Sequence, residues 1–232
     1  MTGSRYRSLI VAMVTAAAMA ALSWFGVMWA GTAGVGRMLP WIVGRGLGIA
    51  GYLSLFGLTI FGLWLRHPWR ARIATPSPET VLRVHAVLAP LTLVLIVGHI
   101  VALALDKYAG VGWSGAFVPG ASAYRTLAVA LGTLSLYFGG LVGATAALAG
   151  RWRRLPWLPV HRLASLSFAT VWLHGVLAGS DTPAMLPIYV ITGAMALAMW
   201  ITRRITARPV SRPAARSGAI GEGRPLARTG PR

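Results

Sequence analysis

The chain has 232 residues, of which 56% are hydrophobic and only 11% are charged. A soluble domain usually carries about 25% charged residues, so the composition excludes an ordinary soluble domain and predicts an integral membrane protein. The formal net charge of +18 lies mostly at the ends of apolar runs and in the tail, where arginines orient a membrane protein and contact lipid headgroups. Since no nucleic-acid motif accompanies this charge, we expect no nucleic-acid partner.

Apolar runs follow one another along the chain, and each is close to the ~20 residues that a helix needs to cross a bilayer. The six runs are 9–30, 41–65, 81–105, 125–149, 160–178 and 184–202. We predict an all-α integral membrane fold, a six-transmembrane-helix bundle over residues 1–206. The Arg- and Pro-rich segment 207–232 is expected to be a disordered cytoplasmic tail. The first run could instead be a signal peptide, although it exceeds the usual apolar length of ~7–15 residues.

Arginines are concentrated in alternate links between these runs. They precede the first run, surround the links after 65 and after 149, and follow the last run, whereas the other links carry little charge. The positive-inside rule then places both termini in the cytoplasm and the loop 106–124 outside. The chain has a single lysine, Lys107, and abundant Ala, Gly and Pro, which indicates a GC-rich bacterial genome. We therefore expect a multi-pass protein of a bacterial plasma membrane.

The chain has five histidines, and four of them form two pairs. His67 precedes a proline at the end of the second run and is expected to be interfacial. His85 and His99 are fourteen positions apart on the third run, and His161 and His174 are thirteen apart on the fifth. At ~1.5 Å rise per residue, each pair spans about 20 Å. In the predicted topology the third and fifth helices both run from the cytoplasm outward. His85 and His161 therefore share a depth near the cytoplasm, and His99 and His174 share a depth near the outer face.

Histidines inside a membrane can have three roles: a structural hydrogen bond, a metal or haem ligand, or a step in a proton pathway. One ring can simply donate a hydrogen bond to a neighbouring helix, but four rings at matched depths favour a function. Two imidazoles can fill both axial positions of a haem iron, which suits electron transfer because no position is left for a substrate. Proton pathways usually add carboxylates, and the four acidic residues lie at span ends or in loops. Because the chain has no cysteine, thiolate metal sites and Cys-ligated clusters are excluded.

The two histidines on one helix need not point to the same side of that helix. At ~100° per residue, fourteen positions return to within about 40° of the same face, whereas thirteen positions miss it by about 140°. Pro90 lies between His85 and His99 and can kink the third helix. The segment between His161 and His174 has no such device, so tilt or a π-bulge would have to correct its phase.

The segments RVHAVLAPLTLVLIVGHI (83–100) and HRLASLSFATVWLHGVLAGSDT (161–182) resemble the ferric reductase-like transmembrane domain family. Its members include ferric reductases, NADPH oxidases and the haem-binding membrane subunit of the methionine sulfoxide reductase system. The resemblance covers about residues 41–204. It implies two b-type haems held between the third and fifth helices, the inner one by His85 and His161 and the outer one by His99 and His174.

Eukaryotic members of that family continue into a flavin and NADPH domain, but here no G-x-G-x-x-G motif follows a strand. We therefore expect an electron-transfer subunit of an oxidoreductase and not a complete enzyme. Its donor would be a separate cytoplasmic flavoprotein, a bound FMN or a membrane quinol (quinone). Its acceptor would be ferric iron, an extracytoplasmic flavoprotein or a partner reductase. A single-haem, quinol-linked subunit and a non-redox membrane scaffold with structural histidines are the alternatives.

Four arginines are candidate partners of the haem propionates, since Arg can bind a carboxylate bidentately. Arg83 and Arg162 lie near the inner histidines, and Arg45 and Arg125 lie near the outer face. Such arginines can equally extend to lipid phosphates.

Small residues beside the histidines form a last group. Gly98 and Gly175 are next to His99 and His174, where they would let a porphyrin approach the backbone. Gly44 and Gly48 are spaced for close packing between helices.

Overall fold

The computed structural model describes residues 36–72, 76–149 and 157–206, and every element in them is helical. The predicted first span 9–30 and the tail 207–232 lie outside the described residues. The elements are η1 (Gly36–Met38), α2 (Leu39–Trp64), η2 (Pro68–Ala71), α3 (Pro78–Leu105), α4 (Gly112–Phe117), α5 (Thr126–Leu148), α6 (Trp157–His161), α7 (Ala164–Ala178) and α8 (Thr182–Thr206).

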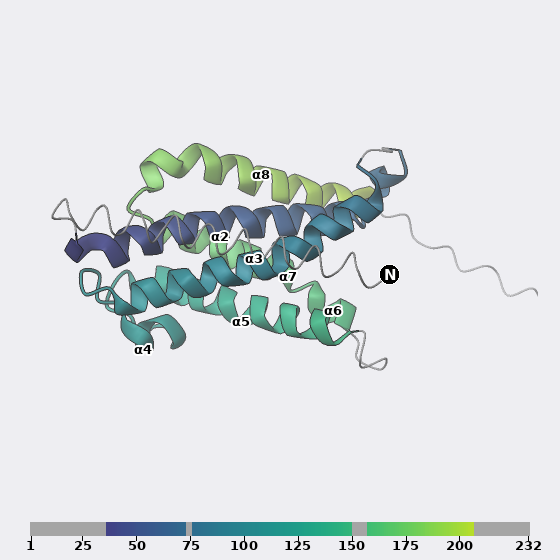
Figure 1. Cartoon of the computed structure of the whole chain (residues 1–232). Helices are drawn as coiled ribbons and strands as arrows, with labels where there is room; N and C mark the ends of the chain where they lie inside the picture. Colours follow the sequence, from purple (N-terminus) through teal and green to yellow (C-terminus); the bar gives the residue numbers. More distant parts are fainter. Residues whose placement is uncertain (1–35, 73–75, 150–156, 207–232) are drawn as a thin grey trace, which may run out of the picture.

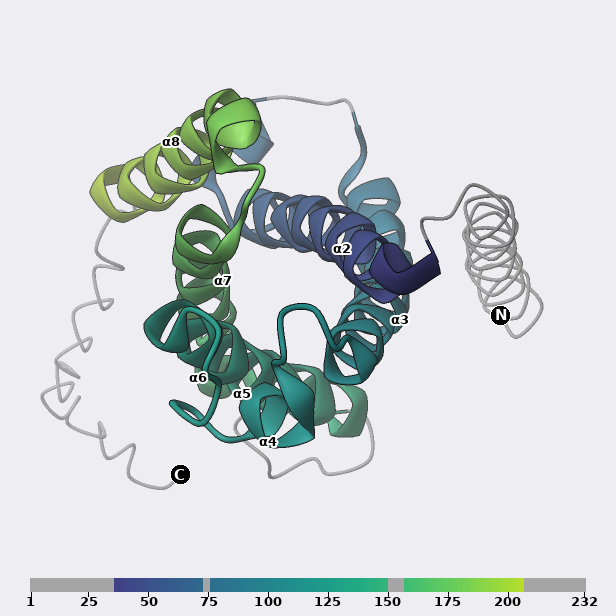
Figure 2. The same ribbon diagram turned by 90° about the vertical axis from the view of Figure 1, so that its left-hand side faces the viewer.

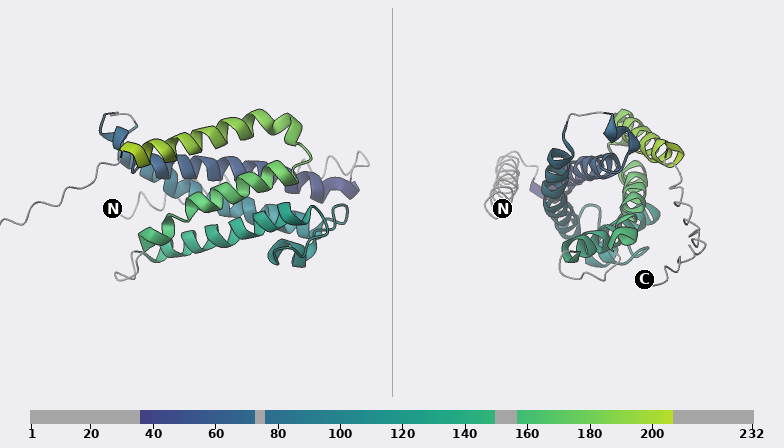
Figure 3. Two further views of the ribbon diagram at one scale, coloured as in Figure 1. Left: turned by 180° about the vertical axis from the view of Figure 1, so that it is seen from behind. Right: turned by 90° about the vertical axis from the view of Figure 1, so that its right-hand side faces the viewer.

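The long helices lie side by side along one axis, and successive helices run in opposite directions (Figure 1). α2 packs against α3, and α5 packs against α7. Viewed along the bundle, α2, α3, α5 and α7 form a ring, with α8 outside it against α2 and α7 (Figures 2 and 3). α3 therefore stands across the ring from α7, and a ligand gripped by both helices would lie on the bundle axis.

Helix ends are set by local side-chain chemistry. Ser77 caps α3, because its Oγ accepts a hydrogen bond from the backbone N–H of Thr80 at 3.2 Å, and Pro78 occupies the first turn, where a missing N–H has no cost. α5 begins after Arg125, which has a left-handed backbone with φ of 39°. The hydroxyl of Thr182 donates to the carbonyl of Gly179 at 2.8 Å and closes the turn between α7 and α8.

Burial in this bundle is reversed relative to that of a soluble protein. Large apolar side chains such as Leu127, Val190 and Leu197 are 57–70% exposed, while several serine and threonine hydroxyls are buried among the aromatic and aliphatic side chains of the interior. Ser135 and Ser167, for example, donate to each other's backbone carbonyl between α5 and α7. An apolar exterior around internally satisfied polar groups is what a bilayer requires.

Four helices are long and apolar enough to cross a membrane: α2, α3, α5 and α8. They agree with the predicted runs 41–65, 81–105, 125–149 and 184–202. The predicted continuous helix 160–178 is wrong in detail, because it is divided by a turn at Arg162 and Leu163 into the single turn of α6 and the 15-residue α7. Among the described residues the structure thus confirms four of the six predicted spans by length and composition.

Candidate functional site

His99 of α3 and His174 of α7 face each other across the ring of helices. Their ring centres are 6.3 Å apart and their planes are inclined by 81°. Both side chains line one cavity, which comprises about 1360 Å³ of unfilled space when its open mouth is included. Its walls are mostly apolar and come mainly from α2, α3, α5 and α7, with Ala116 of α4 and Met185 and Tyr189 of α8.

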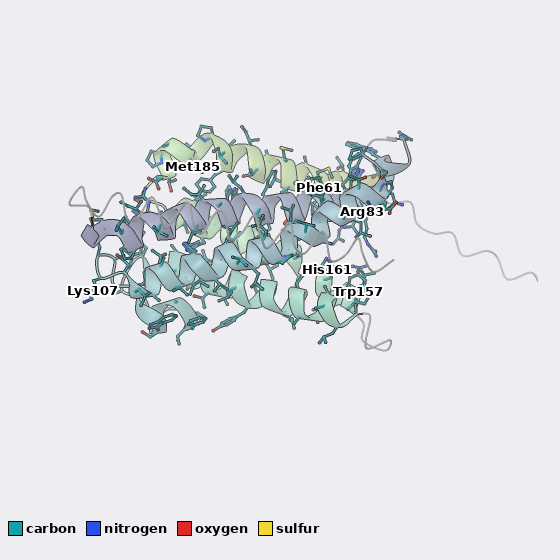
Figure 4. The ribbon with its side chains drawn as sticks, viewed as in Figure 1. Phe61, Arg83, Lys107, Trp157, His161 and Met185 are labelled. Atoms are coloured by element: carbon teal, nitrogen blue, oxygen red, sulfur yellow. The ribbon has the colours of Figure 1, made fainter. Side chains whose placement is uncertain are left out.

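His85 of α3 and His161 of α6 form a second pair with nearly the same separation. Their ring centres are 6.2 Å apart and their planes are inclined by 64°. His161 lies at the same end of the bundle as Trp157 and Arg83, and opposite to Lys107 (Figure 4). The turn between α6 and α7 explains the phase problem: thirteen positions of unbroken helix could not bring His161 and His174 to one face, but a break at Arg162 and Leu163 does.

Three of the four imidazoles are fixed through Nδ1 to a backbone carbonyl of a neighbouring helix. His99 bonds to the carbonyl of Gly44 at 2.6 Å, His174 to that of Ala128 at 2.7 Å, and His85 to that of Leu58 at 3.0 Å. A carbonyl oxygen only accepts, so Nδ1 carries the proton and Nε2 keeps a free lone pair. This is the tautomer and orientation that a metal-ligating histidine needs.

Each of these three carbonyls is followed four residues later by a glycine. The pairs are Gly44 with Gly48, Ala128 with Gly132, and Leu58 with Gly62. In an α-helix the N–H of residue i+4 bonds to the carbonyl of residue i, so the side chain at i+4 stands beside that oxygen. A glycine there leaves the oxygen open to a second donor, which is the incoming imidazole.

The glycine contacts confirm this reading. A Cβ added to Gly48 would lie 2.7 Å from Nδ1 of His99, and one added to Gly132 would lie 2.8 Å from Nδ1 of His174. At Gly62 the nearest ring atom, Cε1 of His85, would be 3.3 Å away. We call each carbonyl with its glycine a carbonyl–glycine seat.

His161 has no such seat. Its Nδ1 is buried and has no hydrogen-bond partner among the described residues. Its ring is instead packed against Trp157, with ring centres 5.6 Å apart. The His85–His161 pair is therefore held on one side only, whereas the His99–His174 pair is held on both.

Among the four candidate arginines, Arg45 is the one that lines the cavity. It lines the cavity together with Asp181 and Trp41. Its Nε donates to Oδ2 of Asp181 at 2.8 Å, and a second bond joins the same two side chains, while its guanidinium lies 5.7 Å from the centre of the Trp41 ring. The charge of Arg45 is already balanced, so a haem propionate here would have to share it with Asp181.

Arg125 has a different setting. It donates to the carbonyl of Leu177 at 2.7 Å, and the neighbouring hydroxyl of Tyr124 donates to the carbonyl of Ala178 at 3.2 Å. Both bonds satisfy free carbonyls at the C-terminal end of α7, where a cation also complements the helix dipole. The structure thus places Arg125 at the cap of the helix that carries His174.

Arg83 and Arg162 lie on the surface at the end of the bundle that holds the second pair. Arg83 forms an ion pair with Glu79 one turn earlier on α3, and both side chains are largely exposed. Arg162 is exposed in the turn between α6 and α7. Each is close in sequence to a histidine of the His85–His161 pair.

Gly98 and Gly175 lie against side chains of neighbouring helices, and Gly175 also lines the cavity. A Cβ on Gly98 would lie 3.0 Å from a methyl of Leu47, and one on Gly175 would lie 2.9 Å from the hydroxyl of Tyr189. These glycines let α3 approach α2 and let α7 approach α8. Gly98 therefore serves helix packing, whereas Gly175 lies both at a helix contact and on the cavity wall.

Aromatic side chains fill the bundle between α2, α7 and α8. Phe168, midway between His161 and His174 in sequence, is 5% exposed and stacks on Tyr52 with ring centres 6.1 Å apart. Tyr189 packs on the edge of the same Tyr52 ring, whose hydroxyl bonds to Thr192.

The chemistry of the donor set fits a two-ligand centre. Among the residues that the structure describes, no group of three or more histidines or carboxylates could hold a bare metal ion. Two histidines are the number that the axial positions of a haem iron take. No family model, no curated protein and no solved structure matches this chain.

Proposed function

We propose that the chain is a membrane cytochrome subunit that holds two b-type haems and relays electrons from one side of a bilayer to the other. The observation that carries this proposal is the spacing of the two histidine pairs, 6.2 Å and 6.3 Å between ring centres. A bond from imidazole nitrogen to a first-row metal is about 2.0 Å, and the ring centre lies about 1.1 Å behind that nitrogen, so two imidazoles on opposite sides of one metal have centres roughly 6.2 Å apart.

In this proposal His99 and His174 hold one haem, and His85 and His161 hold the other. A bis-histidine haem supplies reversible one-electron chemistry without an open position for a substrate. The chain's own residues present Nε2, fix its orientation through Nδ1, and exclude water with apolar walls. These are the tasks that a protein performs for a redox cofactor.

An electron path is better supported than a proton path. The stretches 86–98 and 163–173, which separate the histidines on α3 and α6–α7, contain no acidic residue, and proton relays normally use Asp, Glu or chains of titratable groups. Phe168 and Tyr52 stack between the levels of the two pairs. Packed aromatic rings exclude water, so this region favours electron transfer over proton transfer.

The sequence resemblance to the ferric reductase-like transmembrane domain family belongs to the same proposal. It supplies the direction, from a cytoplasmic donor to an extracytoplasmic acceptor across a bacterial plasma membrane. A flavoprotein, FMN or quinol would donate, and ferric iron or a partner reductase would accept. Arg83 and Arg162 at one end and Arg45 and Arg125 at the other remain the proposed cationic partners of the propionates.

A single-haem subunit is the second candidate. Two observations favour it: the described cavity is lined by His99 and His174, and His161 has no partner for Nδ1. In that case the His99–His174 pair would hold the haem, and His85 and His161 would form a structural contact.

Transmembrane electron transfer tests the proposal directly. The protein is reconstituted into vesicles that enclose ferricyanide, dithionite is added outside, and the reduction of the trapped ferricyanide is followed by its absorbance. We expect rapid reduction with the wild type and His67→Ala, and slow leakage with His85→Ala and His99→Ala. Equal rates in the wild type and in empty vesicles, with haem bound, would refute the relay.

A further inference from the structure

A pocket at the end of the bundle near η2 is lined mainly by arginines. Arg66, Arg70 and Arg203 line about 770 Å³ of unfilled space when its open mouth is included, and Leu65 and Pro68 complete its wall. The pocket joins the end of α2 and η2 to the last turn of α8, which lie together at one end of the molecule (Figure 1). Residues from two distant parts of the chain therefore present their guanidinium groups to one space.

These guanidinium groups have no acidic partner in the part of the chain that the structure describes. The ion pairs there join Arg45 to Asp181 and Arg83 to Glu79. Arg70 donates one bond to the carbonyl of Leu65 at 2.8 Å, which leaves most of its five N–H donors free.

Repulsion makes this arrangement costly. Arg66, Arg70 and Arg203 bring three like charges to the wall of one pocket. Like charges held together without a counter-charge destabilise a fold unless an anion joins them.

Contacts of His67 join the two segments that line the pocket, and we call this junction of α2, η2 and α8 the corner at His67. His67, between α2 and η2, is 2% exposed and bonds through Nε2 to the hydroxyl of Thr202 at 3.0 Å. Its ring also packs against Trp64 and Trp69. Because Thr202 precedes Arg203, this contact fixes the arginines of the two segments relative to each other before any anion binds.

Apolar and aromatic groups extend from the pocket along α8. Ile201 and Ile205 are 39% and 77% exposed, and Trp200 is 41% exposed beneath the guanidinium of Arg204 at 4.8 Å from its ring centre. Trp69 of η2 is 40% exposed. Tryptophan and arginine beside exposed aliphatic side chains are typical of the headgroup level of a bilayer.

We propose that Arg66, Arg70 and Arg203 form a binding site for the phosphate of an anionic phospholipid, whose acyl chains lie along the exposed face of α8. Guanidinium groups bind phosphate oxygens bidentately, and basic pockets between transmembrane helices are known to take acidic lipid headgroups. The site requires no haem and stands independently of the proposed electron relay.

Native mass spectrometry of the full chain tests this site. Protein is released from nanodiscs of phosphatidylcholine that contain a minor share of phosphatidylglycerol, and the retained lipid is counted. We expect one phosphatidylglycerol to be retained in preference to phosphatidylcholine. Arg66→Gln, Arg70→Gln and Arg203→Gln should each weaken that retention roughly fivefold, the effect of one basic residue at a membrane surface.

Arg72→Gln is the matched control, because Arg72 is exposed at the end of η2 and does not line the pocket. It removes the same charge at the same end of the bundle, and retention should stay at the wild-type level. Equal loss in Arg72→Gln and Arg66→Gln would overturn the site, since it would show only diffuse attraction to the surface. Each variant must first elute as a single folded species in size-exclusion chromatography. If one of the three pocket variants does not fold, the other two still test the site.

A second arm separates a lipid from a soluble anion. Inorganic phosphate is titrated into the protein in neutral-lipid nanodiscs, and phosphatidylglycerol retention is measured again. We expect millimolar phosphate to compete weakly, because it lacks acyl chains to contact α8. Displacement of the lipid at micromolar phosphate would overturn the lipid assignment in favour of a soluble phosphate ligand.

Discussion

Gly48 of α2 lies so close to His99 of α3 that a Cβ on the glycine would be 2.7 Å from Nδ1 of the ring. The same ring bonds to the carbonyl one turn earlier on α2. The two contacts together define both where the imidazole sits and which nitrogen it offers.

Replacing a seat glycine should therefore displace its histidine. We expect Gly48→Ala and Gly132→Ala to lower haem content by up to one haem per chain, because the new methyl would overlap the ring. Gly62→Ala should have a weaker effect, since its nearest contact is 3.3 Å. Haem content is measured as the pyridine haemochromogen absorbance per mole of protein.

Neighbouring glycines supply the controls for this series. Gly46 on α2 and Gly140 on α5 have no atom within 4 Å of an added Cβ. Gly46→Ala and Gly140→Ala should bind haem like the wild type. If these variants lost as much haem as Gly48→Ala, the effect would come from the helix and not from the seat.

The two centres should also differ in how tightly they hold haem. Loss of an outer-sphere partner typically weakens metal binding by ~10–100-fold, and Nδ1 of His161 has none among the described residues. The haem left in His99→Ala should therefore pass to apomyoglobin faster than the haem left in His85→Ala. The order is measured by the rise of myoglobin absorbance, and the reverse order would contradict the role given to the seats.

The inclination of the imidazole planes predicts a spectroscopic signature. Imidazole planes inclined at 81° and 64° overlap with different dπ orbitals of the iron, so these two orbitals would be nearly equal in energy. Ligand orientation is one of the means by which a protein tunes iron. We expect strongly anisotropic low-spin ferric EPR signals with a large maximum g value. A rhombic signal like that of parallel imidazoles would show that the rings turn on binding haem.

Acidification should loosen the corner at His67. Burial, and then the nearby charge of Arg203, lower the pKa of His67 from its ordinary value, and Nδ1 accepts a bond from the backbone N–H of Trp69. The unfolded chain binds this proton more readily, so stability is complete above about pH 6.5 and falls below it. The midpoint of thermal unfolding of the wild type should therefore drop between about pH 7.5 and about pH 5.5.

His67→Gln isolates this contribution, because glutamine does not titrate while the other histidines are unchanged. Its unfolding midpoint should depend less on pH than that of the wild type. An identical pH dependence in both proteins would mean that His67 is not protonated in this range.

Much of the fold could be predicted from the sequence, because hydropathy and length alone define a spanning helix. Four predicted runs became the long helices α2, α3, α5 and α8. The break after His161 could not be predicted, since HRLASLSF contains neither glycine nor proline to mark it. The uneven phase of thirteen residues was its only sign.

The histidine pairing could be predicted from depth, but the seats could not. The spacing of Gly44 and Gly48 predicts only close helix packing, because a glycine spacing does not reveal which side chain enters the space. The carbonyl that each imidazole uses depends on the register between α2 and α3, or between α5 and α7, which only the fold supplies. The position of Arg125 near the outer face predicts a propionate partner, yet its contacts are carbonyls of α7.

Haem stoichiometry, together with the reduced-minus-oxidised spectrum of the purified protein, tests the central claim most directly. The two pairs predict a b-type spectrum and two haems per chain, one haem in His85→Ala and in His99→Ala, and two in His67→Ala. Absence of a b-type band, or haem content that is unchanged by replacing both His85 and His99, would contradict the assignment of these histidines as iron ligands.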